Sequence, residues 1–150
     1  MKYAYINGTI LEHAQATLHI SDLGLRRGYA VFEFLRVLEG IPVFLEDHLD
    51  RFARSAALLE LEPPHGPEEL ARVVLELIGR NQISEGGIQM LLTGGYSEDA
   101  FTPGRPNLII TPIPVNPPPP QLYEKGGKII LHQNRRELPE AKTTDYLVAV

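Results

Sequence analysis

Lys142 is the residue whose type and position most suggest chemistry, because it lies between a proline turn and a short apolar run. Residues 136–150 read RELPEAKTTDYLVAV, so Pro139 turns the chain shortly before the lysine. We expect a helix to begin near Thr144, with Lys142 at its first turn. A cation is poorly placed there, because that end of the helix dipole favours anions. The lysine is therefore either solvated at the surface or held for the chemistry of its amine.

A strand that could carry further functional side chains is expected at residues 29–37 (YAVFEFLRV), which are rich in aromatic and branched residues. Side chains of a strand alternate between its two faces. One face carries Val31, Glu33, Leu35 and Val37. The other carries Phe32, Phe34 and Arg36. From the alternation alone, the two phenylalanines are expected to be core residues, and the arginine is expected to be solvated or paired with a surface carboxylate.

The composition is that of an ordinary globular protein and excludes several kinds of site. The chain has 150 residues, 43% hydrophobic and 22% charged, which suits one domain with a real core. It has no cysteine, so disulfides and thiolate catalysis are excluded, and its five histidines are too scattered to predict a metal site. A net charge of −5 argues against nucleic acid as a partner. We find no signal-peptide pattern or membrane-length apolar run, and expect a cytoplasmic protein that does not enter a membrane.

The first part of the chain predicts two hairpins separated by a loop. Residues 3–10 contain the turn signal Asn7-Gly8 between two short strands. Residues 19–28 are expected to form a loop. The strand at residues 29–37 then turns at Gly40 into a return strand at residues 41–44.

Two amphipathic helices follow. The first begins at Glu46-Asp47 and ends before Pro63, with Arg51 roughly opposite its apolar stripe. The second begins with Pro67 in its first turn. The predicted stripes are Leu49, Phe52, Ala53, Ala56 and Leu59 in the first helix, and Leu70, Val73, Val74, Leu77 and Ile78 in the second.

The remaining strands are expected at residues 88–93, 108–111 and 128–132. Six prolines between residues 112 and 120 require an extended segment that cannot join a central ladder, and we interpret it as an edge crossing within one domain. Two long helices and six or seven strands, joined mainly by hairpin-length turns, predict an α+β fold. We expect a mostly antiparallel sheet flanked by two helices.

Three stretches together resemble the N-terminal half of the class IV aminotransferases, the fold-type IV pyridoxal-phosphate (PLP) enzymes. Residues 28–36 (GYAVFEFLR) are similar to the family's G-x-x-V-F-E-x-x-R strand. Residues 47–56 (DHLDRFARSA) are similar to its [DE]-H-L-x-R-[LF]-x-x-S-A helix. Residues 139–142 (PEAK) lie where the family carries its Schiff-base lysine. The family includes branched-chain and D-amino-acid aminotransferases and aminodeoxychorismate lyases.

The resemblance implies a PLP cofactor and assigns residues to it. Lys142 would form the Schiff base and then move the proton between substrate and cofactor. Arg51 would bind the cofactor phosphate with its planar, permanently charged guanidinium, although a solvated helix face also explains an arginine there. Tyr146 would bind the cofactor's phenolic oxygen.

The resemblance also implies that Phe32, Phe34, Arg36 and Gln89 line the substrate pocket. The chain departs from its relatives here. Phe34 stands where many branched-chain enzymes have glycine, and no arginine occurs at Gln89 or in the loop at residues 94–99, where D-amino-acid enzymes carry a carboxylate-trapping arginine. Asp145 stands where relatives commonly have asparagine. The amino-acid substrate and its chirality therefore stay open.

The resemblance divides the chain into an N-terminal α+β domain at residues 1–135 and an interdomain segment at residues 136–150. That second segment would carry the catalytic lysine and the start of a C-terminal domain, which in relatives supplies the carboxylate for the pyridine nitrogen. We accordingly expect a truncated chain that is inactive by itself.

Three functions remain as hypotheses. The first is a PLP-dependent aminotransferase that moves an amino group between an amino acid, branched-chain-like, and a 2-oxo acid. The second is a lyase of the aminodeoxychorismate type using the same lysine. The third is a non-catalytic fragment that only associates. Relatives are homodimers, so self-association is expected under all three.

Overall fold

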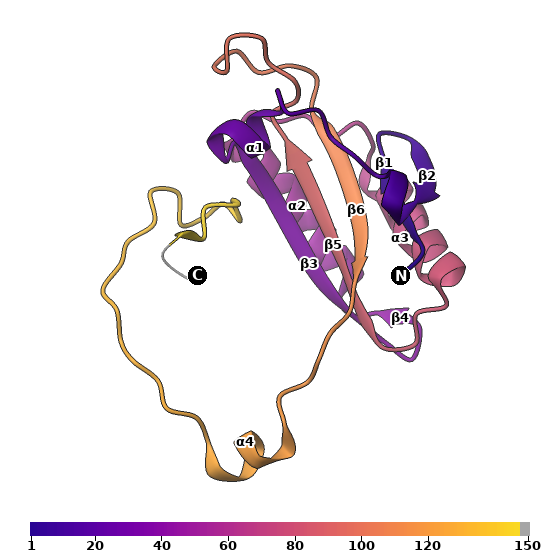
Figure 1. Cartoon of the computed structure of the whole chain (residues 1–150), viewed down its shortest axis with the longest axis vertical. Coiled ribbons are helices and arrows are strands. Elements are labelled where there is room, and N and C mark those ends of the chain that lie inside the picture. Colours follow the sequence, from indigo (N-terminus) through magenta and orange to yellow (C-terminus); the bar gives the residue numbers. More distant parts are fainter. Residues whose placement is uncertain (148–150) are drawn as a thin grey trace.

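The computed structural model describes residues 1–147, and its centre is a sheet with the strand order β2-β1-β6-β5-β3-β4 (Figure 1). All pairings between these strands are antiparallel. The strands are β1 (Tyr3–Ile6), β2 (Thr9–Glu12), β3 (Ala30–Leu38), β4 (Ile41–Pro42), β5 (Gly86–Thr93) and β6 (Asn107–Ile113). The helices are the 3₁₀ turn η1 (His13–Gln15) and α1 (Leu23–Arg27), α2 (Leu45–Leu58), α3 (Pro67–Asn81) and α4 (Pro120–Lys125). The predicted α+β fold with a mostly antiparallel sheet and two long helices is confirmed.

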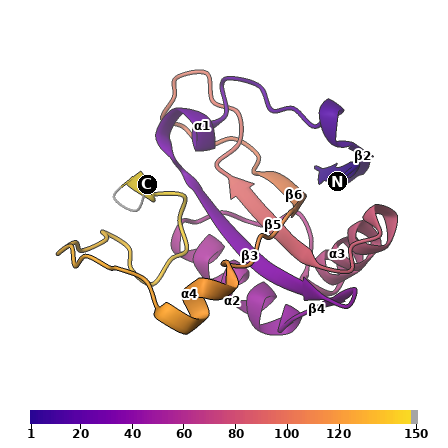
Figure 2. The same cartoon turned by 60° about the horizontal axis from the view of Figure 1, so that its bottom comes forward.

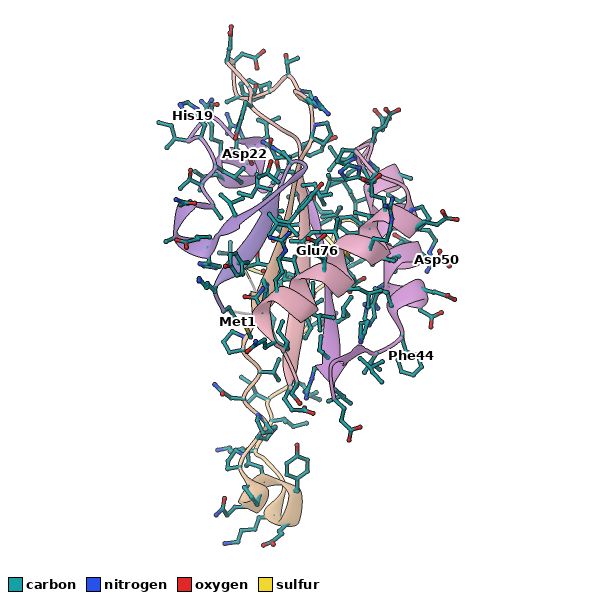
Figure 3. The ribbon with its side chains drawn as sticks, turned by 90° about the vertical axis from the view of Figure 1, so that its right-hand side faces the viewer. Met1, His19, Asp22, Phe44, Asp50 and Glu76 are labelled. Atoms are coloured by element: carbon teal, nitrogen blue, oxygen red, sulfur yellow. The ribbon has the colours of Figure 1, made fainter. Side chains whose placement is uncertain are left out.

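The two long helices α2 and α3 lie on one face of the sheet and form the core with it (Figures 1 and 3). The alternation predicted for β3 is confirmed, because all four residues of its helix-facing set are fully buried. Phe32 and Phe34 on the opposite face are only half-buried, and Arg36 is exposed. The sheet therefore has one face closed by helices and one face that is more open. Among residues 1–147, no helix has the length and apolar character needed to cross a membrane.

The apolar stripes of the helices are confirmed with one exception. In α2, Ala53 is exposed and Ser55 is buried.

The predicted hairpin at residues 3–10 is confirmed, and Asn7 and Gly8 both take positive φ angles (47° and 99°), as a tight hairpin turn requires. The return strand is shorter than predicted and ends at Pro42, because Phe44 takes a left-handed conformation (φ 51°) and precedes α2 as its N-cap.

The loop predicted at residues 19–28 is wrong in part, because it contains the short helix α1. Asp22 caps this helix by accepting a hydrogen bond from the Gly24 amide at 2.8 Å. The same carboxylate, fully buried, also accepts from the Thr93 hydroxyl and the Asn107 amide, both at 2.7 Å. These bonds attach α1 to the ends of β5 and β6, at the end of the molecule where Figure 3 labels Asp22 and His19.

Two predicted strands in the second half of the chain need correction. The strand predicted at residues 108–111 is longer than expected, because Pro112 also lies within β6, opposite Ile88 of β5. Proline is tolerated there because β1 pairs with β6 only at Ile109 and Ile110, so β6 is an edge strand at Pro112. Residues 128–132 form no strand, and their apolar side chains are 82 to 95% exposed. The chain instead leaves the sheet, passes through α4 and returns to β3 (Figures 1 and 2).

Candidate functional site

The segment that carries Lys142 docks on the free edge of β3. The Phe32 amide donates to the Lys142 carbonyl at 2.9 Å, and the Thr144 amide donates to the Ala30 carbonyl at 3.1 Å. Between these bonds, Val31 and Thr143 form an antiparallel bridge. This edge is available because β4 pairs only with the far end of β3, at residues 37 and 38.

The prediction that Lys142 occupies the first turn of a helix is therefore wrong. Residues 142–146 are not helical, and the part of the expected helix at residues 148–150 lies outside the described residues. The pattern was misleading because the segment gains its hydrogen bonds from a strand far away in the sequence. The helix-dipole argument consequently does not apply to this lysine.

Helix α2 fixes the same segment from the other side. The hydroxyl of Ser55, which is fully buried, accepts a hydrogen bond from the Lys142 amide at 3.0 Å. The preceding residue, Ala141, is 1% exposed and belongs to the core. The backbone of Lys142 is thus held by both a strand and a helix, so only its side chain is free to move.

The Lys142 amine lies against two aromatic rings. Its Nζ atom is 4.3 Å from the centre of the Phe32 ring and 3.4 Å from the Tyr146 hydroxyl. The two rings meet edge to face, with centroids 5.4 Å apart. Within residues 1–147 no carboxylate lies within 4.0 Å of this amine. An amine without a carboxylate partner is chemically available to react with a carbonyl group.

Arg51 approaches the same strand from the helix side and is held by Glu33. Its Nε and one terminal nitrogen donate to the two Glu33 carboxylate oxygens at 2.6 and 2.7 Å. His48, one turn earlier on α2, places its Nδ1 3.1 Å from the same carboxylate. The Arg51 side chain is 46% exposed, so the N–H groups that Glu33 does not use can bind an anion in a fixed orientation.

The buried carboxylate of Glu33 stays ionised because of these partners. Burial alone would raise its pKa, but hydrogen bonds from Arg51, the Phe34 amide and His48, together with the Arg51 charge, lower the pKa below its usual value. The pKa of Arg51 is raised, first by its hydrogen bond to Glu33 and also by the Glu33 charge, against the opposing effect of burial.

The predicted substrate residues lie on the open face of the sheet. Phe34 is directly opposite Gln89 in the pairing of β3 with β5. The Phe34 ring extends across Gly87, where any side chain would collide with it. Arg36 is separated from Phe32 by four residues, about 13 Å along a strand, so the structure does not bring it to the lysine.

Sequence reasoning missed several residues of this region. Ser55 was part of a quoted motif but received no role, and Glu33 was assigned only to a strand face. A glutamate among aliphatic residues on a buried face was the signal, because such a carboxylate requires a cationic partner. Arg136 also received no role, and nothing in the sequence pattern indicated its contacts. Its terminal nitrogen donates to the Thr143 hydroxyl at 2.9 Å, and its guanidinium lies 5.1 Å from the centre of the Tyr146 ring.

The donors described above fit a cofactor with an aldehyde, a phosphate and a phenolic oxygen. Lys142 offers a primary amine, Arg51 offers a guanidinium held by a buried carboxylate, and Tyr146 offers a phenol beside the amine. An amine reacts with an aldehyde, and a guanidinium binds phosphate through paired N–H groups. The chemistry of the donor set therefore agrees with the cofactor implied by the sequence motifs.

Comparisons with known proteins agree with this arrangement. The family profile described as "Amino-transferase class IV" matches residues 30–150. A Methanocaldococcus jannaschii protein named putative branched-chain-amino-acid aminotransferase is 32% identical over 97% of this chain and 52% of its own length. The aminodeoxychorismate lyase of Bacillus subtilis is 29% identical over 89% of this chain and 47% of its own length. Other relatives are named D-alanine aminotransferase.

Solved structures show the same fold. The branched-chain amino acid aminotransferase of Escherichia coli superimposes with a TM-score of 0.71 at 23% identity, over 76% of this chain and 40% of that chain. The chain thus spans about half the length of the curated relatives described above, and less of the solved structure.

Proposed function

The chain belongs to the class IV aminotransferase family, and we propose that it provides the lysine side of a PLP site in an enzyme of amino-group transfer. The observation that carries this proposal is the position of Lys142. Its backbone is held by β3 and by Ser55, while its amine lies against Phe32 and Tyr146 without a carboxylate partner in the described part of the chain.

Each of these residues has a distinct role in the proposal. PLP, when bound, supplies an aldehyde for attachment and a ring that withdraws electrons from the substrate carbon. Lys142 would hold the cofactor through Nζ and, once released from it, would move a proton at that atom. Arg51 would bind the phosphate with the N–H groups that Glu33 leaves available. Tyr146 would donate a hydrogen bond to the phenolic oxygen beside the Lys142 amine.

The substrate we propose is an amino acid with an apolar, branched-chain-like side chain, paired with a 2-oxo acid. The M. jannaschii relative carries a branched-chain name, and the open face of the sheet presents Phe32 and Phe34 beside Gln89. The B. subtilis relative favours a second candidate, a lyase that uses the same lysine. Pyruvate release from aminodeoxychorismate, compared with amino transfer to a 2-oxo acid, separates these two activities.

We also propose that the chain self-associates. Ile41, in the short strand β4, and Phe44, two residues after it, are 66% and 73% exposed, and Figure 3 shows Phe44 at the margin of the molecule. Large exposed apolar side chains are typical of interaction sites when they form a patch. If association were the chain's only role, Lys142 would not bind the cofactor even when the C-terminal half of a relative was added to the chain.

A titration with PLP tests the proposed function. We expect the wild-type chain to bind one PLP with the absorbance change of a lysine-bound aldehyde, and Lys142→Met to lose that change. Lys128→Met is the matched control, because Lys128 lies in the exposed segment far from β3 and the substitution removes the same amine. An identical spectral change in wild type and Lys142→Met would refute the proposal.

A further inference from the structure

The free edge of β3 restricts where the lysine segment, which we define as residues 139–147, can pair. The Phe32 amide donates to this segment at 2.9 Å. The next amide on the same edge is that of Phe34, because the amides of a strand alternate between its two edges. It donates instead to the Glu33 carboxylate at 2.8 Å. Farther along, the edge pairs with β4. The lysine segment therefore cannot move toward β4 without displacing contacts that β3 already makes.

The pairing register decides which face of the sheet receives the lysine side chain. Phe32 lies opposite Lys142, because the antiparallel bridge joins the residues next to them. In this register the Ala141 side chain is 1% exposed within the core, while the Lys142 amine lies over the Phe32 ring on the open face. A shift by one residue moves every side chain of a strand to the other face. Such a shift would turn Lys142 toward the helices and remove its amine from the open face.

The Lys142 amide departs from a regular ladder at the point where Ser55 meets it. Two residues directly opposite each other in an antiparallel ladder can exchange two backbone hydrogen bonds. Among the described residues, Phe32 and Lys142 exchange only one, from the Phe32 amide to the Lys142 carbonyl. The Lys142 amide donates instead to the Ser55 hydroxyl at 3.0 Å. Pairing of the segment with β3 therefore ends at Lys142 on this side.

The Ser55 hydroxyl distinguishes the observed register from a shifted one. Its side chain is fully buried, and a buried hydroxyl is costly unless it is hydrogen-bonded. The Lys142 amide meets this requirement in the observed register. After a shift by one residue, the amide of Ala141 or Thr143 would have to take its place. Neighbouring amides of an extended chain point in opposite directions, so neither would meet the hydroxyl in the same way.

We propose that Ser55 is a positioning residue, which sets the pairing register of the lysine segment and thereby brings the Lys142 amine onto the open face of the sheet. The hydroxyl acts through the backbone amide of the lysine and does not touch the reacting atoms. This inference rests on the proposed function, because it explains why this side chain of the segment faces the PLP site. It gives a task to the serine of the helix motif at residues 47–56.

Disulfide cross-linking measures the register without PLP or turnover. The chain has no cysteine, so two introduced cysteines can react only with each other within one molecule. Val31→Cys with Thr143→Cys reports the observed register, because these residues lie directly opposite each other. Val31→Cys with Thr144→Cys reports a shift by one residue. The measured quantity is the ratio of the two rates of intramolecular disulfide formation.

We expect the chain with native Ser55 to favour the pair at positions 31 and 143. Ser55→Ala should lower the ratio by about fivefold, the effect of losing one hydrogen bond. Ala56→Gly is the matched control, because it weakens the same helix at the next buried position, keeps the hydroxyl and should leave the ratio within about twofold. Ser55→Thr also keeps the hydroxyl, so we expect it to retain most of the native ratio.

Three results would overturn the inference. The first is an equal ratio in Ser55→Ala and Ala56→Gly, and the second is a ratio in Ser55→Thr as low as in Ser55→Ala. PLP attachment at Lys142 is measured in parallel on the chains without introduced cysteines. Undiminished attachment in Ser55→Ala is the third result, and it sinks the positioning role while the PLP site stands. A ratio that depends on the hydroxyl, in a chain that attaches no PLP at Lys142 even with native Ser55, sinks the PLP site alone.

Discussion

At the scale of single residues, the ion pair between Glu33 and Arg51 explains how a carboxylate can lie in the core. Glu33 is fully buried, and its two oxygens receive two hydrogen bonds from Arg51, one from the Phe34 amide and a contact from His48. A buried charge is tolerated only when such partners replace water. The same bonds fix the guanidinium that we assign to the cofactor phosphate. Glu33 is thus a positioning residue for that group.

The pair predicts a specific dependence of stability on pH. The folded-state pKa of Glu33 is lowered, so its stabilisation is fully present above the unfolded value near 4.3 and is lost as the pH falls through the folded pKa. We expect Glu33→Gln to reduce the free energy of unfolding by about 1–3 kcal/mol at pH 7. This difference from wild type should shrink as the pH is lowered below about 4.3.

Urea unfolding at a series of pH values measures this effect. Glu76→Gln is the control, because Glu76 pairs with Arg80 at 2.6 Å on the exposed face of α3. An exposed pair of this kind contributes about 0–1 kcal/mol. If Glu33→Gln were no less stable than Glu76→Gln at pH 7, the structural role given to the Glu33–Arg51 pair would be wrong.

The motifs predicted part of this site. Lys142 and Tyr146 lie together on Phe32, as their proposed roles require, and Phe34 lies opposite Gln89. The partner of Arg51 was not predicted, because a local pattern can show that Glu33 faces the helices but not which cation meets it. The individual roles of these residues in binding remain predictions.

At the scale of secondary-structure elements, α1 shows how tertiary contacts decide a short helix. Residues 23–27 are too few to display helical periodicity, so the sequence indicated only a loop. The helix forms because Asp22 caps it and joins it to Thr93 and Asn107. Gly28 then ends it with a positive φ of 66°, which glycine adopts without strain.

Asp22→Ala tests this dependence. The substitution leaves the Gly24 amide, the Thr93 hydroxyl and the Asn107 amide without their acceptor, and two of these groups are buried. We expect the free energy of unfolding to fall by about 2–4 kcal/mol. Asp50→Ala, on the exposed side of α2, removes the same charge and should change stability by about 0.5 kcal/mol or less. Equal effects of the two substitutions in chemical denaturation would contradict the capping role. Figure 3 labels both positions.

The prediction of a strand at residues 128–132 is wrong for a related reason. Ile129 and Ile130 have high strand propensity and Leu131 is apolar, but β propensity expresses how well a residue fits a paired and half-buried surface. In this structure the segment lies away from the sheet, and these three side chains are exposed. A propensity without a pairing partner does not produce a strand.

At the scale of the whole molecule, the chain consists of a sheet-and-helix body and a long segment that leaves it and returns. Figure 1 shows this segment passing through α4 and coming back beside β3. The family motifs predicted the order of the site residues along the chain. They could not predict that the lysine segment docks on the edge of β3 through a β-bridge, since the contact joins residues more than a hundred positions apart. The division of the chain after residue 135 stays a prediction.

The central claim is that this docking prepares Lys142 for PLP, and chemical trapping tests it most directly. The purified chain is incubated with PLP and reduced with borohydride, and its peptides are then mapped by mass spectrometry. The sequence has four lysines, Lys2, Lys125, Lys128 and Lys142, so every position can be quantified. We predict near-stoichiometric labelling at Lys142 and little at the other three. Labelling spread evenly over the four lysines, or absent from Lys142, would contradict the claim that this chain holds a PLP site.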